Sequence, residues 1–309
     1  MIKNKTNKII TLIASIFLLA GCALPGLGGG FGGETIRVAG LNSTEGQIIS
    51  SMVQQLIEEE TDYNVELISN LGTGIVGHHA LVNGDADVLA PTYTGTDIVA
   101  IFGETASYDA DETMAYLQER FSNEYNHKYY DTMGFENTYA FMVTEELAQE
   151  KNLEKVSDLK DIADDLRAGF DQTWLIREGD GYPAFQEAYE FSFGETYPMQ
   201  IGLVYDAVAS GDMDVVLGYS TDGRILSNNL VVLEDDLGFF PPYEGSVRAT
   251  DEILESNPEL DALFERLVGQ IDTELMQQLN FEADDNLLEP SIVAERFLIE
   301  NNYFRGEGS

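Results

Sequence analysis

Two tyrosines stand at the ends of two similar segments of the chain. In the first segment, Asp85 to Ala90 (DADVLA) follow a glycine and lead to Tyr93-Thr94-Gly95-Thr96. In the second, Asp212 to Leu217 (DMDVVL) also follow a glycine and lead to Tyr219-Ser220-Thr221. A tyrosine ring offers an electron-rich face, and the small hydroxyl side chains beside it offer uncharged hydrogen bonds.

These two segments predict where a ligand would bind. In open α/β sheets, ligands bind beyond the carboxyl ends of the strands, so Tyr93 and Tyr219 should both face a cleft. If each segment belongs to a different lobe, the cleft lies between the lobes. The alternative is that two strand-and-turn units resemble each other by chance.

Catalysis is not expected. The chain has only three histidines, and it contains neither a zinc-protease HExxH motif, nor a GxSxG elbow, nor a phosphate-binding Walker loop. The Asp-x-Asp pairs are better explained as turn caps than as calcium ligands, because the spacing of an EF-hand loop does not follow them. No metal and no cofactor are predicted.

The mature part of the chain reads as an α/β protein of two lobes. Short apolar runs at 34–39, 65–69 and 86–90 predict strands, and the intervening stretches have helical spacing, which favours a parallel-rich sheet. We expect residues 138–144 to carry the chain into the second lobe and a return near 231–239. The helices expected at 251–265, 273–279 and 291–301 would then pack on the first lobe. The predicted division is 34–135 for the first lobe, 136–235 for the second and 236–309 for the return to the first.

The N-terminal residues predict export and lipid anchoring. Three lysines precede an apolar run at 9–20, and Leu19-Ala20-Gly21-Cys22 follows, which resembles a bacterial lipobox. Residues 1–21 are therefore expected to be a signal peptide, Cys22 the lipidated N-terminus and 22–33 a glycine-rich tether. A stray cysteine in a signal peptide is the alternative. The apolar run is too short for a comfortable membrane span.

The composition argues against a nucleic-acid partner. Acidic residues outnumber basic residues 55 to 16, and the formal net charge is −39. Such a surface repels nucleic acid and anionic lipid headgroups. An acidic excess spread along the whole chain identifies no ligand.

Four motifs in register resemble a known family. They are Tyr93-Thr94-Gly95-Thr96, Asn137-Thr138-Tyr139-Ala140, Gly218-Tyr219-Ser220-Thr221-Asp222-Gly223 and Phe240-Pro241-Pro242-Tyr243. The chain resembles the substrate-binding proteins of glycine betaine, carnitine and choline ABC transporters, of the OpuC and ProX type, from about Glu34 to Phe304. The resemblance implies a two-lobe, type II solute-binding fold that closes an aromatic cage around a trimethylammonium group.

Carried over position by position, the resemblance implies a set of binding residues. The cage tyrosines would be Tyr93, Tyr139, Tyr219 and Tyr243. Thr96 matches the position that hydrogen-bonds the carboxylate or hydroxyl end of the ligand. One departure is Leu41, which stands where relatives often have a glutamine that helps to hold the carboxylate.

A quaternary ammonium ion explains why tyrosines are needed. It carries a full positive charge but has no N–H to donate, so ring faces are its natural partners, each contributing roughly 0.5 to 2 kcal/mol. Four rings would supply about 2 to 8 kcal/mol, whereas micromolar binding requires about 8 kcal/mol. A second, polar anchor must contribute. Because Thr96 is uncharged, betaine or carnitine should bind at least as well as choline.

The resemblance therefore predicts an extracytoplasmic, membrane-anchored receptor of an ABC importer. Its partners would be a small quaternary amine, a permease and the ATPase of that permease, and the receptor itself would be a monomer. A receptor for another cationic metabolite or for an amino acid is the main alternative, although an amine with N–H groups would require paired carboxylates. A structural lipoprotein or adhesin is a third possibility.

Overall fold

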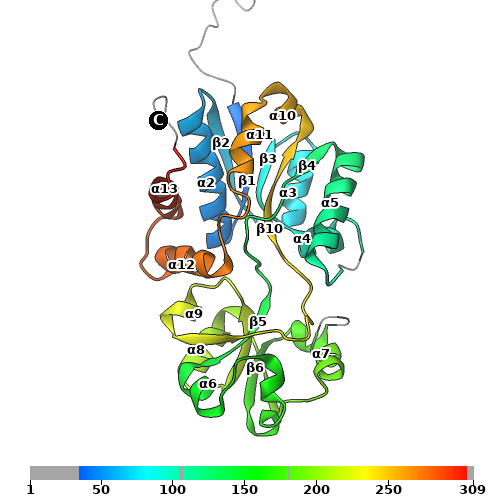
Figure 1. Cartoon of the computed structure of the whole chain (residues 1–309), viewed down its shortest axis with the longest axis vertical. Helices are drawn as coiled ribbons and strands as arrows, with labels where there is room; N and C mark the ends of the chain where they lie inside the picture. The colour runs from blue at the N-terminus through cyan, green and yellow to red at the C-terminus, as the bar shows by residue number, and fades with distance from the viewer. Residues whose placement is uncertain (1–34, 105–106, 178, 180, 305–309) are drawn as a thin grey trace, which may run out of the picture. The chain divides into compact units, whose positions relative to one another are not determined.

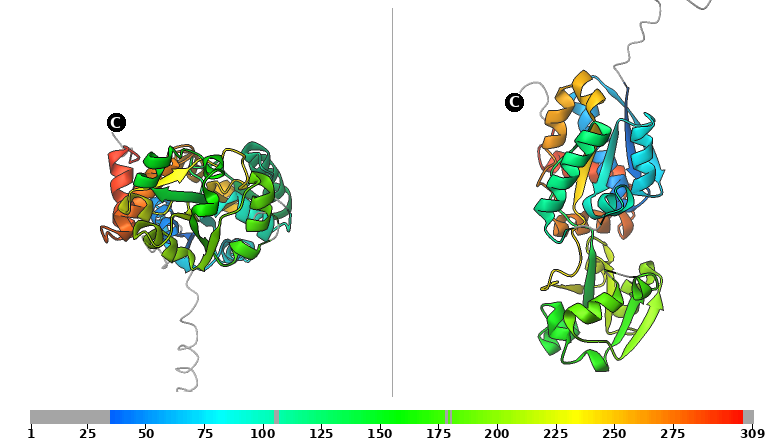
Figure 2. Two further views of the ribbon diagram at one scale, coloured as in Figure 1. Left: turned by 90° about the horizontal axis from the view of Figure 1, so that it is seen from below. Right: turned by 90° about the vertical axis from the view of Figure 1, so that its right-hand side faces the viewer.

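Two five-stranded sheets form the frameworks of two lobes (Figures 1 and 2). The computed structural model describes residues 35–104, 107–177, 179 and 181–304. The strands of the first lobe are β1 Thr35–Leu41, β2 Asn64–Leu71, β3 Val88–Tyr93, β4 His127–Tyr129 and β10 Gly245–Thr250. Those of the second are β5 Tyr139–Thr144, β6 Arg167–Asp171, β7 Glu195–Met199, β8 Val215–Tyr219 and β9 Leu230–Leu233.

The two sheets share one topology. Their strand orders are β2-β1-β3-β10-β4 and β7-β6-β8-β5-β9. In each sheet the first three strands are parallel, and the fourth strand in the order runs antiparallel to both of its neighbours. The fourth strand is the one by which the chain enters from the other lobe, and the predicted two-lobe α/β fold is confirmed.

Helices cover both sheets. Around the first sheet lie α2 Thr44–Glu60, α3 Gly74–Val82, α4 Thr94–Ala100, α5 Ala110–Tyr125, α10 Asp251–Ser256, α11 Glu259–Glu265, α12 Thr273–Asp284 and α13 Pro290–Glu300. Around the second lie α6 Glu145–Lys151, α7 Tyr182–Tyr189, α8 Val204–Ala209 and α9 Arg224–Ser227, with short 3₁₀ turns at Val156–Leu159, Ala163–Asp165, Trp174–Ile176 and Ile201–Leu203.

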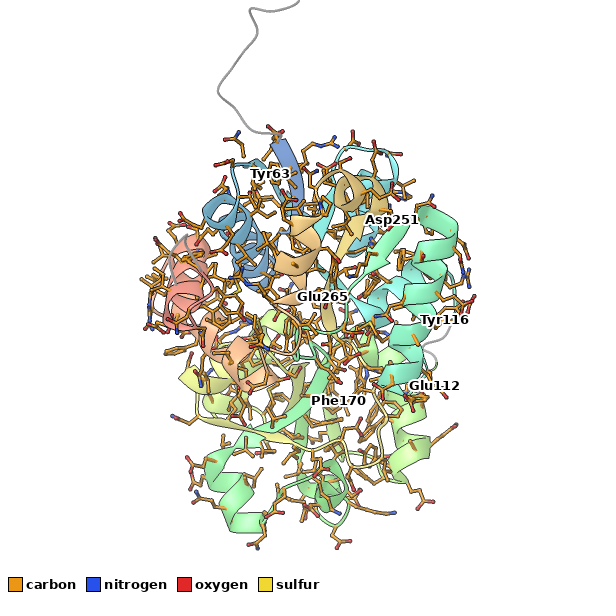
Figure 3. The ribbon with its side chains drawn as sticks, turned by 45° about the horizontal axis from the view of Figure 1, so that its top comes forward. Tyr63, Glu112, Tyr116, Phe170, Asp251 and Glu265 are labelled. Carbon is orange, nitrogen blue, oxygen red and sulfur yellow. The ribbon has the colours of Figure 1, made fainter. Side chains whose placement is uncertain are left out.

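Helix α2 shows how the sequence builds these layers. Ser43 caps the helix by accepting a hydrogen bond from the N–H of Gly46. The apolar positions at helical spacing, Ile48, Ile49, Met52, Val53, Leu56 and Ile57, are all fully buried in the core of the first lobe. Many acidic residues lie on the outside instead, and Figure 3 shows Glu112 on α5 and Glu265 on α11, both of them exposed.

Two sequence predictions need correction. The strand expected at 86–90 is β3, which runs from Val88 to Tyr93 and so includes the tyrosine. In the second lobe, Trp174 is fully buried on a 3₁₀ turn, because the Asp171 carboxylate accepts hydrogen bonds from the N–H groups of Thr173 and Trp174 and closes the chain into a turn. The single helix expected at 251–265 is two helices, with Pro258 between them.

The chain also returns to the first lobe later than expected. Strand β9 pairs with β5 in the second sheet, and Phe239 and Phe240 still pack in the core of the second lobe. The segment that leads to β10 therefore follows Phe240, because these two rings bury their surface among the aromatic side chains of the second lobe.

The internal repeat seen in the sequence is a structural repeat. In each sheet, an arginine on the second strand in the order, β1 or β6, donates to the carboxylate of the aspartate that precedes the third strand, β3 or β8. The same arginine also donates to the carbonyl of a glycine with positive φ. The members are Arg37, Asp87 and Gly84 in the first lobe and Arg167, Asp214 and Gly211 in the second. This matched arrangement gives β3 and β8 the same place in their sheets, so each strand ends in its tyrosine at the same edge.

Two antiparallel segments connect the lobes. The N–H of Asn137 donates to the carbonyl of Tyr243 at 3.0 Å, and the N–H of Gly245 donates to the carbonyl of Phe135 at 3.1 Å. Between these bonds, Glu136 and Glu244 stand opposite each other. Burial, with a further contribution from Glu136, raises the pKa of Glu244 from 4.5 to about 7.

We expect the Glu244→Gln variant to show how the charge of Glu244 beside Glu136 affects the stability of the fold. Because the folded-state pKa of Glu244 lies above its ordinary value, its contribution to stability is fully present below pH 4.5 and is lost as the pH rises through 7. The melting temperature of the variant should exceed that of the wild type by a few degrees at pH 8 and match it at pH 4. Differential scanning calorimetry checks this, with the exposed Glu119→Gln as control; an equal gap at both pH values would refute the assignment.

Candidate functional site

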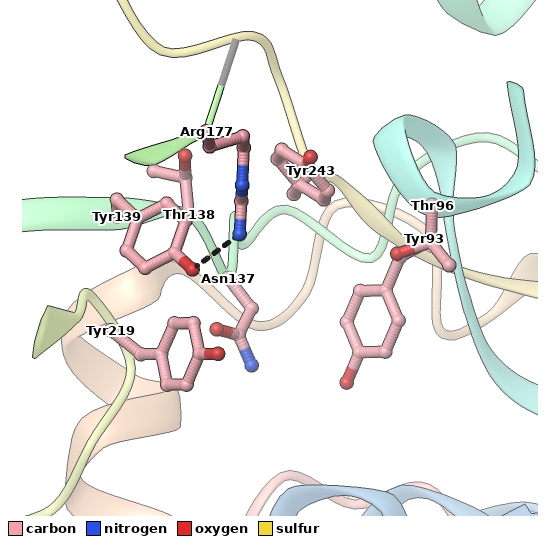
Figure 4. A pocket seen from close by; sticks show the side chains of 8 residues that line it. All are labelled: Tyr93, Thr96, Asn137, Thr138, Tyr139, Arg177, Tyr219 and Tyr243. Atoms are coloured by element: carbon pink, nitrogen blue, oxygen red, sulfur yellow. Dashed lines mark hydrogen bonds between the residues drawn. The ribbon is translucent and has the colours of Figure 1, made fainter. Parts of the chain in front are cut away.

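One cavity of about 310 Å³ collects every ligand-binding residue that the sequence predicts (Figure 4). Its lining residues are Tyr93, Thr96, Asn137, Thr138, Tyr139, Arg177, Tyr219 and Tyr243. They come from both lobes and from the segments between them. In Figure 4, Tyr139 and Tyr219 lie on one side and Tyr93 and Thr96 on the other.

Tyr139 and Tyr219 form one wall of the cavity. They are direct neighbours across the antiparallel strands β5 and β8. Their ring centres are 5.3 Å apart and the ring planes differ by 26°, so the two rings stack. Tyr219 is 38% exposed although it ends a buried strand, which leaves its ring open to the cavity.

Buried groups hold this wall from behind. The N–H of Tyr219 donates to the hydroxyl of the fully buried Tyr205 at 2.7 Å. Gly218 makes that approach possible, because a Cβ there would lie 2.8 Å from the Tyr205 ring. On the other side, Arg177 donates to the Tyr139 hydroxyl at 3.0 Å, and its guanidinium lies 5.4 Å from the centre of that ring.

Tyr243 is positioned by the YTGT motif. The hydroxyl of Thr94 accepts from the N–H of Glu244 at 3.0 Å and donates to the carbonyl of Pro242 at 3.3 Å. A Cβ on Gly95 would lie 2.7 Å from the Pro242 carbonyl oxygen and 2.8 Å from the Tyr243 ring. The motif therefore has three roles. Tyr93 contributes its own ring, the Thr94 hydroxyl binds the second connecting segment through two hydrogen bonds, and Gly95 leaves the space that Tyr243 occupies.

Thr96 reaches the cavity from the first turn of α4. The next residue, Asp97, is 1% exposed, and its carboxylate accepts from the Thr92 hydroxyl at 2.5 Å. The fully buried Arg248 lies 3.7 Å from the same carboxylate and stacks over Phe121. Burial nevertheless raises the pKa of Asp97. This buried pair fixes the start of α4 and with it the direction of Thr96.

Leu41, the departure noted in the sequence, ends strand β1 with 9% of its surface exposed and does not line the cavity. Three lining residues, Arg177, Asn137 and Thr138, were not predicted from the sequence. Arg177 is the one cationic side chain among the lining residues within the described ranges. One signal could have marked it, since only 16 of the 309 residues are basic and this one precedes the helix start at Gly181-Tyr182-Pro183.

Other sequence predictions lie outside the cavity. Cys22 falls outside the described residues. His78 is buried against the ring of Tyr125, with the ring centres 4.7 Å apart, and it lines no part of the cavity. In the described ranges, no group of three or more histidine, cysteine, aspartate or glutamate side chains could hold a metal ion. None of the helices in these ranges is both long and apolar enough to cross a membrane.

A family model described as the substrate-binding domain of ABC-type glycine betaine transport systems matches residues 34–300. The chain belongs to this family. It is 49% identical over 298 residues to the carnitine transport binding protein OpuCC of Listeria monocytogenes, covering 96% of both chains. The family is a class of transport receptors and not of enzymes.

Two further comparisons agree with this placement. A permease and binding protein for ergothioneine from Helicobacter pylori is 30% identical, over 96% of this chain and 53% of that longer protein. A crystal structure named for a glycine betaine/carnitine/choline ABC transporter superposes with a TM-score of 0.84 at 45% identity, covering 87% of this chain and 99% of the other.

The Gly95→Ala variant should disturb the cavity although none of its tyrosines is substituted. The added methyl group would meet the Pro242 carbonyl and the Tyr243 ring at distances that require movement, at a cost of about 1 to 3 kcal/mol. We expect a lower melting temperature and a displaced Tyr243 ring in a crystal structure of the variant. Gly72→Ala is the matched control, since nothing lies within 4 Å of its Cβ position; equal melting temperatures for the two variants would contradict the packing argument.

Proposed function

We propose that this protein is an extracytoplasmic substrate-binding protein of an ABC importer and that it captures quaternary-ammonium solutes such as glycine betaine, carnitine and choline. The observation that carries the proposal is the convergence of Tyr93, Tyr139, Tyr219 and Tyr243 on one cavity from both lobes. Family membership and the name of the carnitine-binding relative support it.

The chemistry of the cavity suits a methylated ammonium group. Of the eight lining residues in the part of the chain that the structure describes, half are tyrosines and none is an aspartate or glutamate. An amine with N–H groups would face ring surfaces for much of its contact, and each buried donor left unpaired there would cost about 1 to 3 kcal/mol. A trimethylammonium group has no such donors, and the ring faces contact its methyl groups and its charge together.

We assign the carboxylate of a zwitterionic ligand to Arg177 and Thr96. Arg177 brings a positive charge to the wall that Tyr139 forms, and Thr96 adds an uncharged hydroxyl on the opposite side. A guanidinium binds a carboxylate strongly and repels a simple cation. Glycine betaine and carnitine should therefore bind more tightly than choline, and Arg177 takes over the anchoring that Leu41 cannot provide.

The remaining parts of the proposal concern delivery. A lipid on Cys22 and the tether at 22–33 would hold a monomeric receptor at the outer face of the membrane. The loaded receptor would pass its solute to a membrane permease, whose ATPase drives uptake. We further propose that binding closes the lobes about the two connecting segments, with the second lobe extending through Phe240.

A receptor for a different cationic metabolite is the second candidate. The relative from Helicobacter pylori is named for ergothioneine, so related chains carry names for more than one solute. A calorimetric panel that includes ergothioneine and a primary amino acid separates the two candidates. Binding of the amino acid without binding of any quaternary amine would overturn the cage.

The Tyr219→Ala variant tests the cage directly. Removing one of four rings should weaken glycine betaine binding about tenfold or more by isothermal titration calorimetry. Its melting temperature should change little, because the ring is partly exposed. Tyr197→Ala is the matched control, since Tyr197 is also 38% exposed but lies on β7, away from the cavity. Equal affinities for the two variants would contradict the assignment.

The Arg177→Gln variant tests the anchor. Glutamine can still donate to the Tyr139 hydroxyl but carries no charge. We expect the affinity for glycine betaine and carnitine to fall on the order of tenfold, while the affinity for choline stays the same or rises. The ratio of the dissociation constants of glycine betaine and choline is the measurement. A parallel loss for all three ligands would show that Arg177 acts only through the shape of the cavity.

A further inference from the structure

A buried carboxylate lies against the tyrosine cage. Glu45 belongs to the first turn of α2 and is 3% exposed. Its Oε1 accepts from the Tyr93 hydroxyl at 2.5 Å and from Nδ2 of Asn137 at 2.9 Å, and its Oε2 accepts from Nδ2 of Asn280 at 3.3 Å. All three partners donate, which is the arrangement that an ionised carboxylate requires.

These partners connect Glu45 to both lobes and to the first connecting segment. Tyr93 ends β3, Asn137 belongs to the first connecting segment, and Asn280 lies on α12. The same Nδ2 of Asn280 also donates at 2.8 Å to the carbonyl of Thr221, two residues after the cage residue Tyr219. One carboxylate therefore orients a cage ring in the first lobe and, through Asn280, meets the loop that carries another ring in the second.

The charge of Glu45 has a direct effect on Tyr93. A hydroxyl that donates to a carboxylate polarises its own ring, so the ring face attracts a cation more strongly. Burial limits the screening of that charge by solvent. Burial and Glu45 together also raise the pKa of Tyr93 well above its ordinary value, so the phenol keeps the proton that it donates.

Glu45 adds a negative charge that the cage tyrosines lack. The four cage tyrosines are neutral, and among the lining residues that the structure describes, the charged side chain, Arg177, is positive. The carboxylate of Glu45 brings a negative charge within hydrogen-bonding distance of the hydroxyl of Tyr93. Nothing in the cage motifs identifies Glu45, since it lies far from all of them in the sequence.

We propose that Glu45 is a positioning and specificity-determining residue that acts through Tyr93. It fixes the ring and gives the cage a preference for a trimethylammonium group over a neutral group of the same shape. The inference rests on the proposed function, because it assumes that the cage takes a quaternary amine.

The test compares glycine betaine with 3,3-dimethylbutanoate, in which a carbon atom replaces the charged nitrogen and the carboxylate is kept. In the Glu45→Gln variant, an amide oxygen can still accept from Tyr93 but the charge is gone. The affinity for glycine betaine should fall on the order of tenfold, while the affinity for the carbon analogue should stay the same or rise. A fall of the same size for both ligands would reduce Glu45 to a structural role and overturn the proposal.

The Tyr93→Phe variant provides an independent arm that does not depend on the folding of a Glu45 variant. It keeps the ring and removes the hydroxyl link, so glycine betaine should again lose affinity selectively. Because Glu45 acts through Tyr93, the double variant should lose less than the product of the two single losses. A selectivity for glycine betaine that Tyr93→Phe leaves unchanged would contradict the proposal.

Two controls separate this inference from the proposed function. Glu59→Gln removes one charge from an exposed position of the same helix and should bind both ligands as the wild type does. Wild-type protein that binds no quaternary amine would overturn the proposed function and this inference with it. Wild-type protein that binds glycine betaine but loses no selectivity in Glu45→Gln would overturn this inference alone.

Discussion

A trimethylammonium group presents a full positive charge inside a shell of methyl groups, with no hydrogen to donate. Attraction by ring faces is short-ranged and each face contributes only about 0.5 to 2 kcal/mol, so a receptor has to bring several rings to one point from different directions. A single sheet edge offers one direction. Two lobes on either side of a cavity offer several directions. In this protein the four tyrosines line one cavity from both lobes and from the segments between them, which meets the requirement.

The same local arrangement occurs once in each lobe and places two of those rings. In each lobe an arginine–aspartate ion pair lies at the start of the strand that is third in the sheet, β3 or β8, and this strand ends in a tyrosine. The other two cage tyrosines lie on or next to the connecting segments. Small residues then make room behind the rings, as Gly218 does for Tyr205 and Gly95 does for Tyr243. The lining residues are thus positioned by neighbours that do not themselves line the cavity, and the geometry of the site depends on both lobes and on the segments between them.

Sequence patterns predicted the parts of the site that are local. The echo around Tyr93 and Tyr219 follows from strand and turn chemistry, and the family motifs added Tyr139, Tyr243 and Thr96. Arg177 and Glu45 were missed because their roles arise from contacts between residues distant in the chain; Glu45 meets partners 48 and 92 positions away. The late return of the chain was missed for a related reason, since packing among aromatic side chains keeps Phe239 and Phe240 in the second lobe.

The most direct test of this account is a crystal structure of the protein with glycine betaine bound. The account predicts that the nitrogen of the ligand lies within about 6 Å of the ring centres of Tyr93, Tyr139, Tyr219 and Tyr243, with the carboxylate toward Arg177. A ligand bound outside this cavity, or one whose nitrogen contacts fewer than two of these rings, would contradict it.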